Sequence, residues 1–115
     1  MIKIEAVVRS TKFHIVQDAL HDAGILTFSA YDIKLTGLHK GHRTSGGRPG
    51  TFRSSDLIAK TNITVICAED QESKIIQTIT DAARTGDRGD GLISVYPIQS
   101  LLKIRNGKTG EAAVK

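Results

Sequence analysis

Hydrophobic and polar residues alternate in four separate stretches of the chain, and a period of two is typical of β-strands with one buried face. The alternating stretches are residues 2–9, 26–35, 57–67 and 92–98, with 101–105 as a short extension of the last. The stretch 57–67 fits best as the hairpin partner of 26–35. The pattern therefore predicts four strands.

Two further stretches place apolar residues at helical spacing. The first contains Phe13, Val16 and Leu20, with Ser10 or Thr11 as a candidate N-cap and a stop at Gly24. The second opens near Asp70 and carries five apolar residues on one face: Ile75, Ile76, Ile79, Ala82 and Ala83. The resulting order βαββαβ predicts a ferredoxin-like α+β sandwich formed by a single domain over residues 1–115.

Composition narrows the class of protein. The chain has 115 residues, of which 39% are hydrophobic and 24% charged, so we expect a soluble globular protein and not a disordered or fibrous one. The single cysteine, Cys67, lies in the apolar run 63–68, which favours a buried thiol in a reducing compartment. That run is too short to cross a membrane, and the first residues alternate like a strand, so we expect a cytoplasmic protein without membrane insertion.

Two glycine-rich segments interrupt the predicted elements. Residues 37–55 form a long loop rich in Gly, Lys and Arg, and the segment 83–91 contains Gly86, Gly89 and Gly91 directly after the second helix. Three glycines at a helix end allow backbone amides to converge on an anion, although a helix stop followed by a turn explains them equally well. On a strand, Lys103 and Arg105 would share one face and could bind phosphate, although exposed strand cations more often have no ligand.

At this point the sequence resembles a known family. The segment 82–93, Ala-Ala-Arg-Thr-Gly-Asp-Arg-Gly-Asp-Gly-Leu-Ile, and the segment 104–111, Ile-Arg-Asn-Gly-Lys-Thr-Gly-Glu, closely resemble the B-loop and C-loop signature of the PII nitrogen-regulatory signal-transduction proteins. Lys40-Gly-His42 matches the start of the family's T-loop. The resemblance implies a homotrimer of ferredoxin-like subunits that binds ADP or ATP between neighbours, with a T-loop at 38–55, a B-loop at 84–91 and a C-terminal loop at 103–115.

The resemblance also implies which residues surround the nucleotide. Ser29, Ile66 and Val7 would lie around the adenine, backbone amides of the T-loop base and the B-loop would hold the phosphates, and the C-terminal loop would supply charge. The full set is Val7, Ser29, Gly37, Leu38, His39, Lys60, Ile66, Gly89, Asp90, Gly91, Lys103 and Arg105. The T-loop would dock on a target protein, a membrane transporter or a metabolic enzyme, through Lys40, His42, Arg43, Arg48, Phe52 and Arg53.

Several positions depart from the family. His39 stands where the family has a Gln that helps to hold magnesium with 2-oxoglutarate. Lys60 matches the family's Lys that contacts 2-oxoglutarate or phosphate, so only part of that site is kept. The sequence therefore argues against magnesium-dependent 2-oxoglutarate sensing. Leu92 replaces a phosphate-binding Lys, and the loss of this cation weakens attraction most at the γ-phosphate. We therefore predict that ADP binds at least as well as ATP. The T-loop contains no Tyr, which excludes uridylylation of a loop tyrosine.

Other functions have weaker support. A nucleic-acid-binding ferredoxin-like domain using the basic loop usually carries stacking aromatics on central strands, and here only Phe28 and Tyr31 qualify, on opposite faces. A nucleotide hydrolase would need a nucleophile with its base, which the sequence does not indicate; Asp90 beside glycines more often caps a turn. The pair His39 and His42 is a poor metal site without a third ligand. We expect a regulator and not an enzyme, without a nucleic-acid partner.

Overall fold

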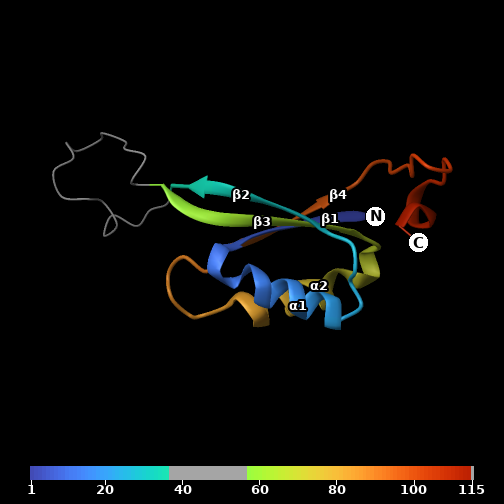
Figure 1. Cartoon of the computed structure of the whole chain (residues 1–115). Helices are drawn as coiled ribbons and strands as arrows, with labels where there is room; N and C mark the ends of the chain where they lie inside the picture. Colours follow the sequence, from blue (N-terminus) through green and yellow to red (C-terminus); the bar gives the residue numbers. More distant parts are fainter. Residues whose placement is uncertain (37–56, 115) are drawn as a thin grey trace.

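Four strands form one antiparallel sheet, and both α-helices cover the same face of it (Figure 1). The computed structural model describes residues 1–36 and 57–114. In chain order the elements are β1 (Ile2–Arg9), the 3-10 helix η1 (Ser10–Lys12), α1 (Phe13–Asp22), β2 (Ser29–Leu35), β3 (Ile58–Cys67), the 3-10 helix η4 (Glu69–Gln71), α2 (Glu72–Ala83), β4 (Leu92–Pro97) and the 3-10 helix η5 (Gly110–Val114). The order βαββαβ confirms the predicted ferredoxin-like fold.

The strand order is β2-β3-β1-β4, so β1 and β3 are central. β2 pairs with β3 in the predicted hairpin, from Ser29 opposite Thr64 to Leu35 opposite Ile58. β1 pairs with β3 on one side and with β4 on the other. The hairpin fixes the ends of β2 and β3 beside each other, immediately before and after residues 37–56.

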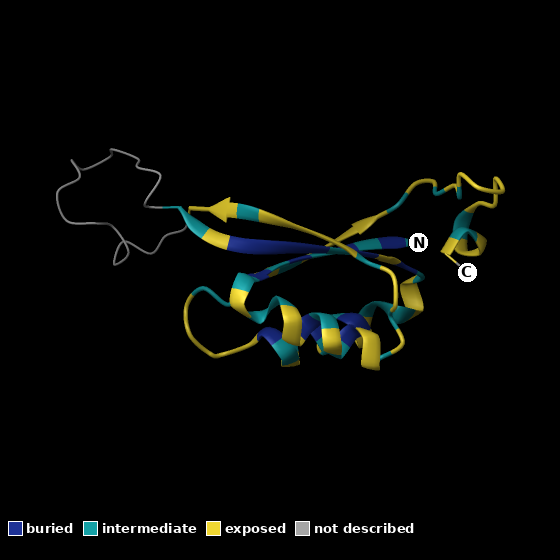
Figure 2. Cartoon of the chain, in the orientation of Figure 1, coloured by how far each residue is buried: buried dark blue, intermediate teal, exposed yellow. Residues whose placement is uncertain are grey.

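The core lies between the sheet and the helices, and its residues follow the periods seen in the sequence. β1 is buried at every second position, and β3 contributes Ile63, Val65 and Cys67. α1 buries Val16 and Leu20, one turn apart, and α2 buries Ile75, Ile79 and Ala83 at intervals of four. Figure 2 shows this buried layer along the central strands and the inner sides of the helices.

The opposite face of the sheet is not covered by any described element. Residues directly opposite each other in antiparallel strands share a face, which places Lys3, Ile66 and Tyr96 together on this open side. The Lys3 ammonium lies 4.9 Å from the centre of the Tyr96 ring. Tyr31 and Leu92, on the two edge strands, share the open face and are 55% and 74% exposed. Exposed apolar side chains thus lie along a surface that a partner can cover.

Three sequence-based expectations about element ends were wrong. Neither Ser10 nor Thr11 caps α1, because both lie in η1 and the Ser10 hydroxyl instead accepts a hydrogen bond from Thr61 on β3 (3.1 Å). Residues 26–28 precede β2, and Phe28 packs against the core with its ring 5.4 Å from that of His21. Residues 101–105 do not extend β4 and instead enter a separate turn. In the first two cases a tertiary contact outweighs the local pattern, and in the third the turn dipeptide Asn106-Gly107 reverses the chain.

No helix in the described ranges is long and apolar enough to span a bilayer.

Candidate functional site

The loop that follows α2, residues 84–91, is organised around one carboxylate. Asp90 Oδ2 accepts hydrogen bonds from the backbone amides of Thr85 and Gly86, both at 2.9 Å, and Oδ1 accepts one from the Thr85 hydroxyl at 2.5 Å. The Asp87 amide donates to the same Thr85 hydroxyl at 3.1 Å. Asp90 therefore closes the loop on itself, which is the turn-capping role expected for it.

These bonds hold Asp90 in its ionised form. The Thr85 hydroxyl, then the amides of Thr85 and Gly86, and then the Arg9 guanidinium lower the pKa of Asp90 well below its usual range. Because a carboxylate with such a low pKa does not act as a general acid near neutral pH, the geometry assigns Asp90 to loop structure and not to proton transfer.

Gly91 fixes the loop against the sheet. It has φ +112°, in the region that only glycine adopts readily, and a Cβ here would lie 2.8 Å from the Val7 carbonyl carbon and closer still to its oxygen. The next residue, Leu92, pairs with Val7 across β1 and β4. The backbone of the loop therefore ends in direct contact with β1.

Two cations meet the loop from the sheet. Arg9 Nε lies 3.4 Å from Asp90 Oδ1, and Arg9 Nη2 donates to the Arg88 carbonyl at 2.5 Å. Lys60, directly opposite Arg9 in the register, donates through Nζ to the Gly89 carbonyl. Burial, and then the neighbouring Arg9 charge, lower the pKa of Lys60, while Asp90 opposes this shift. Two cations facing one carboxylate leave a net positive charge beside the loop, which suits an anion.

Arg9 is a site residue that the sequence analysis missed. Its position at the end of a strand resembles any solvated arginine, and only the register places it opposite Lys60 and against the loop. We call this part of the molecule the loop end: Arg9, Lys60 and residues 84–91.

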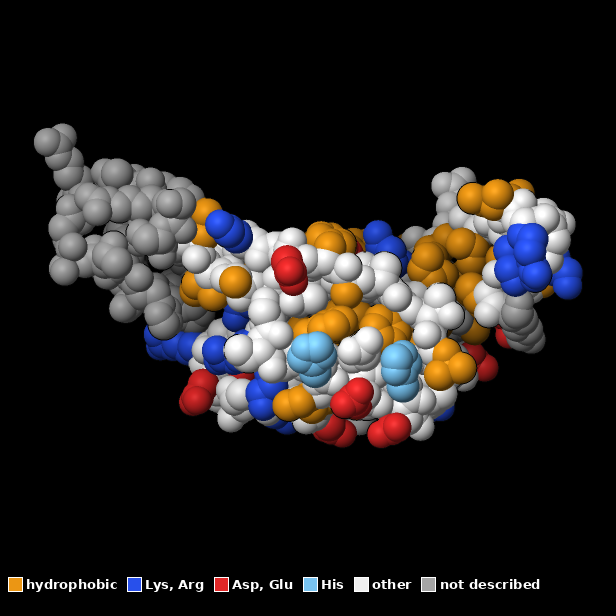
Figure 3. Space-filling model, in the orientation of Figure 1, with side chains coloured by type: hydrophobic (Ala, Val, Ile, Leu, Met, Phe, Trp, Pro, Cys, Tyr) orange, Lys and Arg blue, Asp and Glu red, His pale blue; other side chains and the backbone are white. Residues whose placement is uncertain are grey.

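A cleft of about 880 Å³ lies at the opposite end of the sheet. Its walls are the connection before β2, the last part of β3, the start of η4 and the C-terminal segment. The predicted residues Ser29, Ile66 and Lys103 all line it. Figure 3 shows hydrophobic side chains where the C-terminal segment meets the body of the molecule. We call this part the tail end.

The C-terminal segment at the tail end forms a small hairpin instead of the predicted strand extension. Leu102 bridges to Thr109, the Lys103 amide donates to the Lys108 carbonyl at 2.8 Å, and the Gly107 amide donates to the Lys103 carbonyl at 2.8 Å. Arg105 lies in the turn of this hairpin. Lys103 and Arg105 therefore do not share a strand face, because the chain reverses between them and Lys108.

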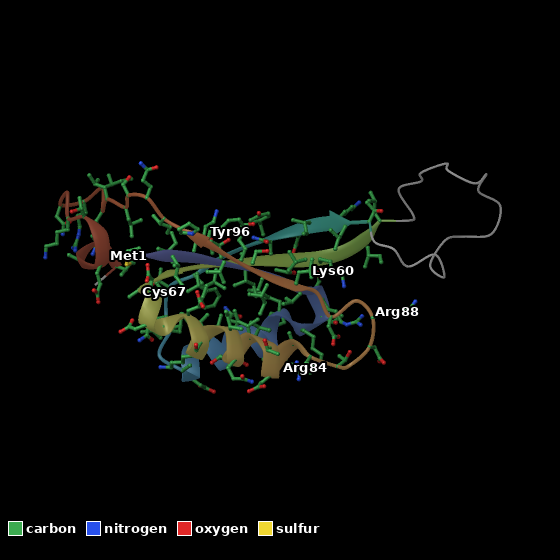
Figure 4. The ribbon with its side chains drawn as sticks, turned by 180° about the vertical axis from the view of Figure 1, so that it is seen from behind. Met1, Lys60, Cys67, Arg84, Arg88 and Tyr96 are labelled. Atoms are coloured by element: carbon green, nitrogen blue, oxygen red, sulfur yellow. The ribbon has the colours of Figure 1, made fainter. Side chains whose placement is uncertain are left out.

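The predicted nucleotide-site residues fall into two groups in one copy of the chain. Val7, Lys60 and Gly89–Gly91 lie at the loop end, whereas Ser29, Ile66, Lys103 and Arg105 lie at the tail end. Lys60 and Ile66 are both on β3, about 20 Å apart at roughly 3.3 Å per residue. Figure 4 shows the same separation, with Lys60 and Arg88 toward one end and Met1 and Cys67 at the other.

Several predicted residues lie outside the described ranges. They are Gly37, Leu38, His39, Lys40, His42, Arg43, Arg48, Phe52 and Arg53. The described residues that flank them, Thr36 and Leu57, continue from the paired ends of β2 and β3. Both strand ends lie beside Lys60, and so at the loop end.

Comparisons with known proteins agree on one family. The family model described as nitrogen regulatory protein P-II matches residues 1–108. A nitrogen regulatory protein P-II of Cereibacter sphaeroides is 38% identical over 114 residues, which cover 99% of this chain and 100% of the relative. One of Azospirillum brasilense is 36% identical with the same coverage. Among solved structures, the crystal structure of Arabidopsis thaliana PII bound to citrate matches with a TM-score of 0.77 and 30% identity, over 97% of this chain and 90% of that one.

Proposed function

Because this chain belongs to the nitrogen regulatory protein P-II family, we propose that it is a signalling protein that senses adenine nucleotides and regulates a target protein. ADP or ATP would bind between neighbouring copies in a homotrimer, and residues 38–55 would dock on the target in the cytoplasm. The family comprises nitrogen regulatory proteins, so we treat the chain as a regulator and not as an enzyme.

One observation supports this proposal: the residues that the resemblance assigns to a nucleotide site lie in two groups, at the two ends of the same sheet. Lys60 and the loop glycines cannot share a ligand with Lys103 and Arg105 of the same copy, because the length of β3 separates them. A second copy that places its tail end against the loop end would complete the site. The open sheet face, with exposed Tyr31 and Tyr96, provides a surface for such an assembly.

The two ends offer complementary chemistry for a nucleotide. Arg9 and Lys60 give the loop end a positive charge that suits phosphates. The cleft at the tail end lies within the usual range of small-molecule sites, roughly 300–1,000 Å³, and Ile66 supplies apolar surface for a base. Lys103 and Arg105 would add cations to the phosphates from the second copy.

The proposed signal runs through Lys60. A phosphate at the loop end would compete with the Gly89 carbonyl for the Lys60 ammonium, and Lys60 lies two residues beyond Ile58, where β3 begins. A nucleotide that binds more tightly when residues 38–55 are arranged for docking would raise the fraction of molecules in that arrangement. The size of this shift would be set by the difference in its affinity for the two arrangements. That segment contains Lys40, Arg43, Arg48 and Arg53 and no acidic residue, so the target surface is proposed to be acidic, on a membrane transporter or a metabolic enzyme.

The direct test is calorimetric titration of the purified protein with ADP and ATP, each with and without magnesium and 2-oxoglutarate. We expect binding of both nucleotides, ADP at least as tightly as ATP, and no dependence on 2-oxoglutarate. Citrate belongs in the same series, because the Arabidopsis thaliana PII structure is described as bound to it. No binding of either nucleotide would refute the proposal, and salt-sensitive binding of an oligonucleotide instead would favour the nucleic-acid alternative.

Complementation tests whether the site lies between copies. Lys60→Met damages the loop end and Arg105→Ala damages the tail end, so each variant alone should lose nucleotide binding. Random co-assembly of the two in equal amounts should restore about one quarter of the sites, those in which both contributing ends are intact. Two differently tagged copies of Lys60→Met serve as the control and should restore none. No restoration in mixed oligomers would mean that the site does not combine the two ends.

A further inference from the structure

The C-terminal hairpin, residues 102–109, projects from the tail end of the molecule (Figure 1) and carries an Asn-Gly pair in its turn. Asn106 and Gly107 are both exposed to solvent, and Gly107 adopts φ +70°. A backbone nitrogen attacks the side chain of a preceding asparagine most readily when it belongs to glycine, because no Cβ shields it. The pair is therefore a candidate site of spontaneous covalent change.

The Asn106 side chain is held by the backbone of its own turn. The Lys108 amide donates to Asn106 Oδ1 at 3.1 Å. When a nucleophile adds to Asn106 Cγ, negative charge develops on Oδ1, and a backbone amide at this distance stabilises that charge in the manner of an oxyanion hole. The turn thus supplies a donor for the transition state of an attack on Asn106.

A second hydrogen bond restrains the attacking nitrogen. The Gly107 amide donates to the Lys103 carbonyl at 2.8 Å, and the Lys103 amide donates to the Lys108 carbonyl at 2.8 Å. The Gly107 nitrogen has to leave the Lys103 carbonyl before it can reach Asn106 Cγ. A two-stranded hairpin is only marginally stable in water, so the bond opens locally and the reaction is slow instead of blocked.

We propose that Asn106 is a self-modification site, at which the hairpin converts a neutral amide into a carboxylate. The Gly107 nitrogen forms a bond to Asn106 Cγ, and the side-chain nitrogen of Asn106 leaves as ammonia with the proton from Gly107. Water then opens the cyclic imide at either carbonyl, which gives aspartate or isoaspartate at this position. The Lys108 amide assists the first step through its hydrogen bond to Oδ1.

The product places a negative charge beside basic residues of the hairpin. Arg105 directly precedes Asn106, and Lys108 lies two residues beyond it. A carboxylate at this position attracts the Arg105 guanidinium and repels phosphate. This consequence rests on the proposed function, which assigns Arg105 to the phosphates, whereas the modification itself does not. Nucleotide affinity would therefore fall as the protein molecule ages.

Two other positions lack these features and serve as internal controls. Asp90 also precedes a glycine, but its carboxylate is ionised and accepts hydrogen bonds from the amides of Thr85 and Gly86, so it is a poor target for a nucleophile. Asn62, the other asparagine of the chain, lies on the central strand β3 and is 3% exposed. The β-branched Ile63 follows it and hinders attack by its backbone nitrogen.

Prolonged incubation of the purified protein at neutral pH and physiological temperature tests the site without any nucleotide. An isoaspartyl methyltransferase detects isoaspartate, and peptide mass spectrometry assigns the modified residue. We expect isoaspartate and aspartate to accumulate at residue 106, while Asn62 and Asp90 stay unchanged. An intact Asn106 throughout, or equal rates at Asn62 or Asp90, would overturn the proposal.

A pair of variants tests the role of the Lys108 amide. Lys108→Pro removes the donor to Asn106 Oδ1, whereas Lys108→Ala removes the same side chain and keeps the donor. Both variants keep the Lys108 carbonyl, and hydrogen exchange of the Lys103 amide verifies the hairpin in each. Modification should be about three- to tenfold slower in Lys108→Pro than in Lys108→Ala. An equal or faster rate would overturn the assistance by the amide.

The effect of the new charge is measured separately. Asn106→Asp reproduces one product, and Asn106→Gln keeps a neutral amide on a longer side chain that cyclises less readily. In calorimetric titration with ADP, Asn106→Asp should bind about three- to tenfold more weakly than Asn106→Gln, and equal affinities would overturn the effect of the charge. Modification of Asn106 in a protein that binds no ADP would support the self-modification site and refute nucleotide sensing, so the two proposals fail separately.

Discussion

Replacing Gly91 by alanine should destabilise the protein by about 3 kcal/mol, for two reasons that the structure separates. At φ +112° the alanine backbone is strained, at a cost of about 1–2 kcal/mol. The new Cβ would also overlap the Val7 carbonyl, and relief requires β1 or the loop to move, at a further cost of about 1–3 kcal/mol. Val7 belongs to a central strand paired on both sides, so it cannot yield easily.

Gly86→Ala isolates the first of these two costs. Gly86 has φ +91° in the same loop, but nothing lies within 4 Å of the position of its Cβ. Alanine there should cost only the backbone strain, about 1–2 kcal/mol. Urea unfolding of both variants at one protein concentration should place the Gly91→Ala midpoint roughly 1 M below that of Gly86→Ala, with unchanged slopes.

Equal midpoints for the two variants would refute the reasoning. They would mean that the close approach of loop and sheet at Val7 does not exist in solution, or that the loop yields without cost. A change in the slope, by contrast, would indicate a change in the surface exposed on unfolding, and the comparison would then need refolding kinetics.

Three further predictions concern the same end of the molecule. Leu92→Lys should raise the affinity for ATP relative to ADP by about tenfold in calorimetric titration, because an added cation favours the more highly charged nucleotide. An unchanged ratio of the two affinities would show that residue 92 does not lie near the phosphates. Asp90→Ala should speed amide hydrogen exchange at Thr85 and Gly86 by roughly three- to tenfold, with Asp87→Ala as the control, and equal protection in both variants would contradict the capping geometry. The pKa of Asp90 is lowered in the folded state, so the stability it gives the loop is present above the unfolded pKa and is lost only as pH falls through the lower folded value. An NMR titration of the Gly86 amide should therefore show its transition well below about pH 4, and a midpoint at the ordinary aspartate value would be inconsistent with this.

The elements of the fold were predictable because each one repeats a simple period. β1 is buried at every second residue and α2 at every fourth, and the periodicity of the chain carried both signals. The start of α1 was not predictable in this way. The Ser10 hydroxyl bonds to Thr61 across the fold, and a local capping rule contains no information about a residue on another strand.

The C-terminal hairpin carried a local signal that was overlooked. Asn106-Gly107 is a typical turn dipeptide, and Gly107 adopts φ +70° in the structure. The alternation of apolar and basic residues over 101–105 favoured a strand, and this pattern outweighed the turn dipeptide in the sequence-based prediction. The turn changes the expected site, because Lys103 and Arg105 now belong to a projecting hairpin.

The residues of the loop end were predictable in part, and their arrangement was not. The glycines of the loop and Lys60 could be carried over by resemblance, whereas the role of Arg9 depends on the register of β1 against β3. The division of the site into two ends also follows only from strand directions. Sequence order alone places Lys60 and Ile66 close together, yet a strand of extended residues separates them.

The hydrogen bond from Lys60 to the Gly89 carbonyl has a consequence for how such a protein can diversify. This bond places the proposed phosphate site next to the ends of β2 and β3, between which residues 37–56 lie. A conformational change in that segment therefore does not have to pass through the hydrophobic core beneath the sheet. Substitutions of the core residues Ile4, Val16 or Ile79 should then change the free energy of unfolding without changing the proposed response to nucleotides. Under the proposed function, residues 37–56 can change in length and composition while the nucleotide site stays intact, so the same site could serve a new target protein through the exchange of about twenty residues.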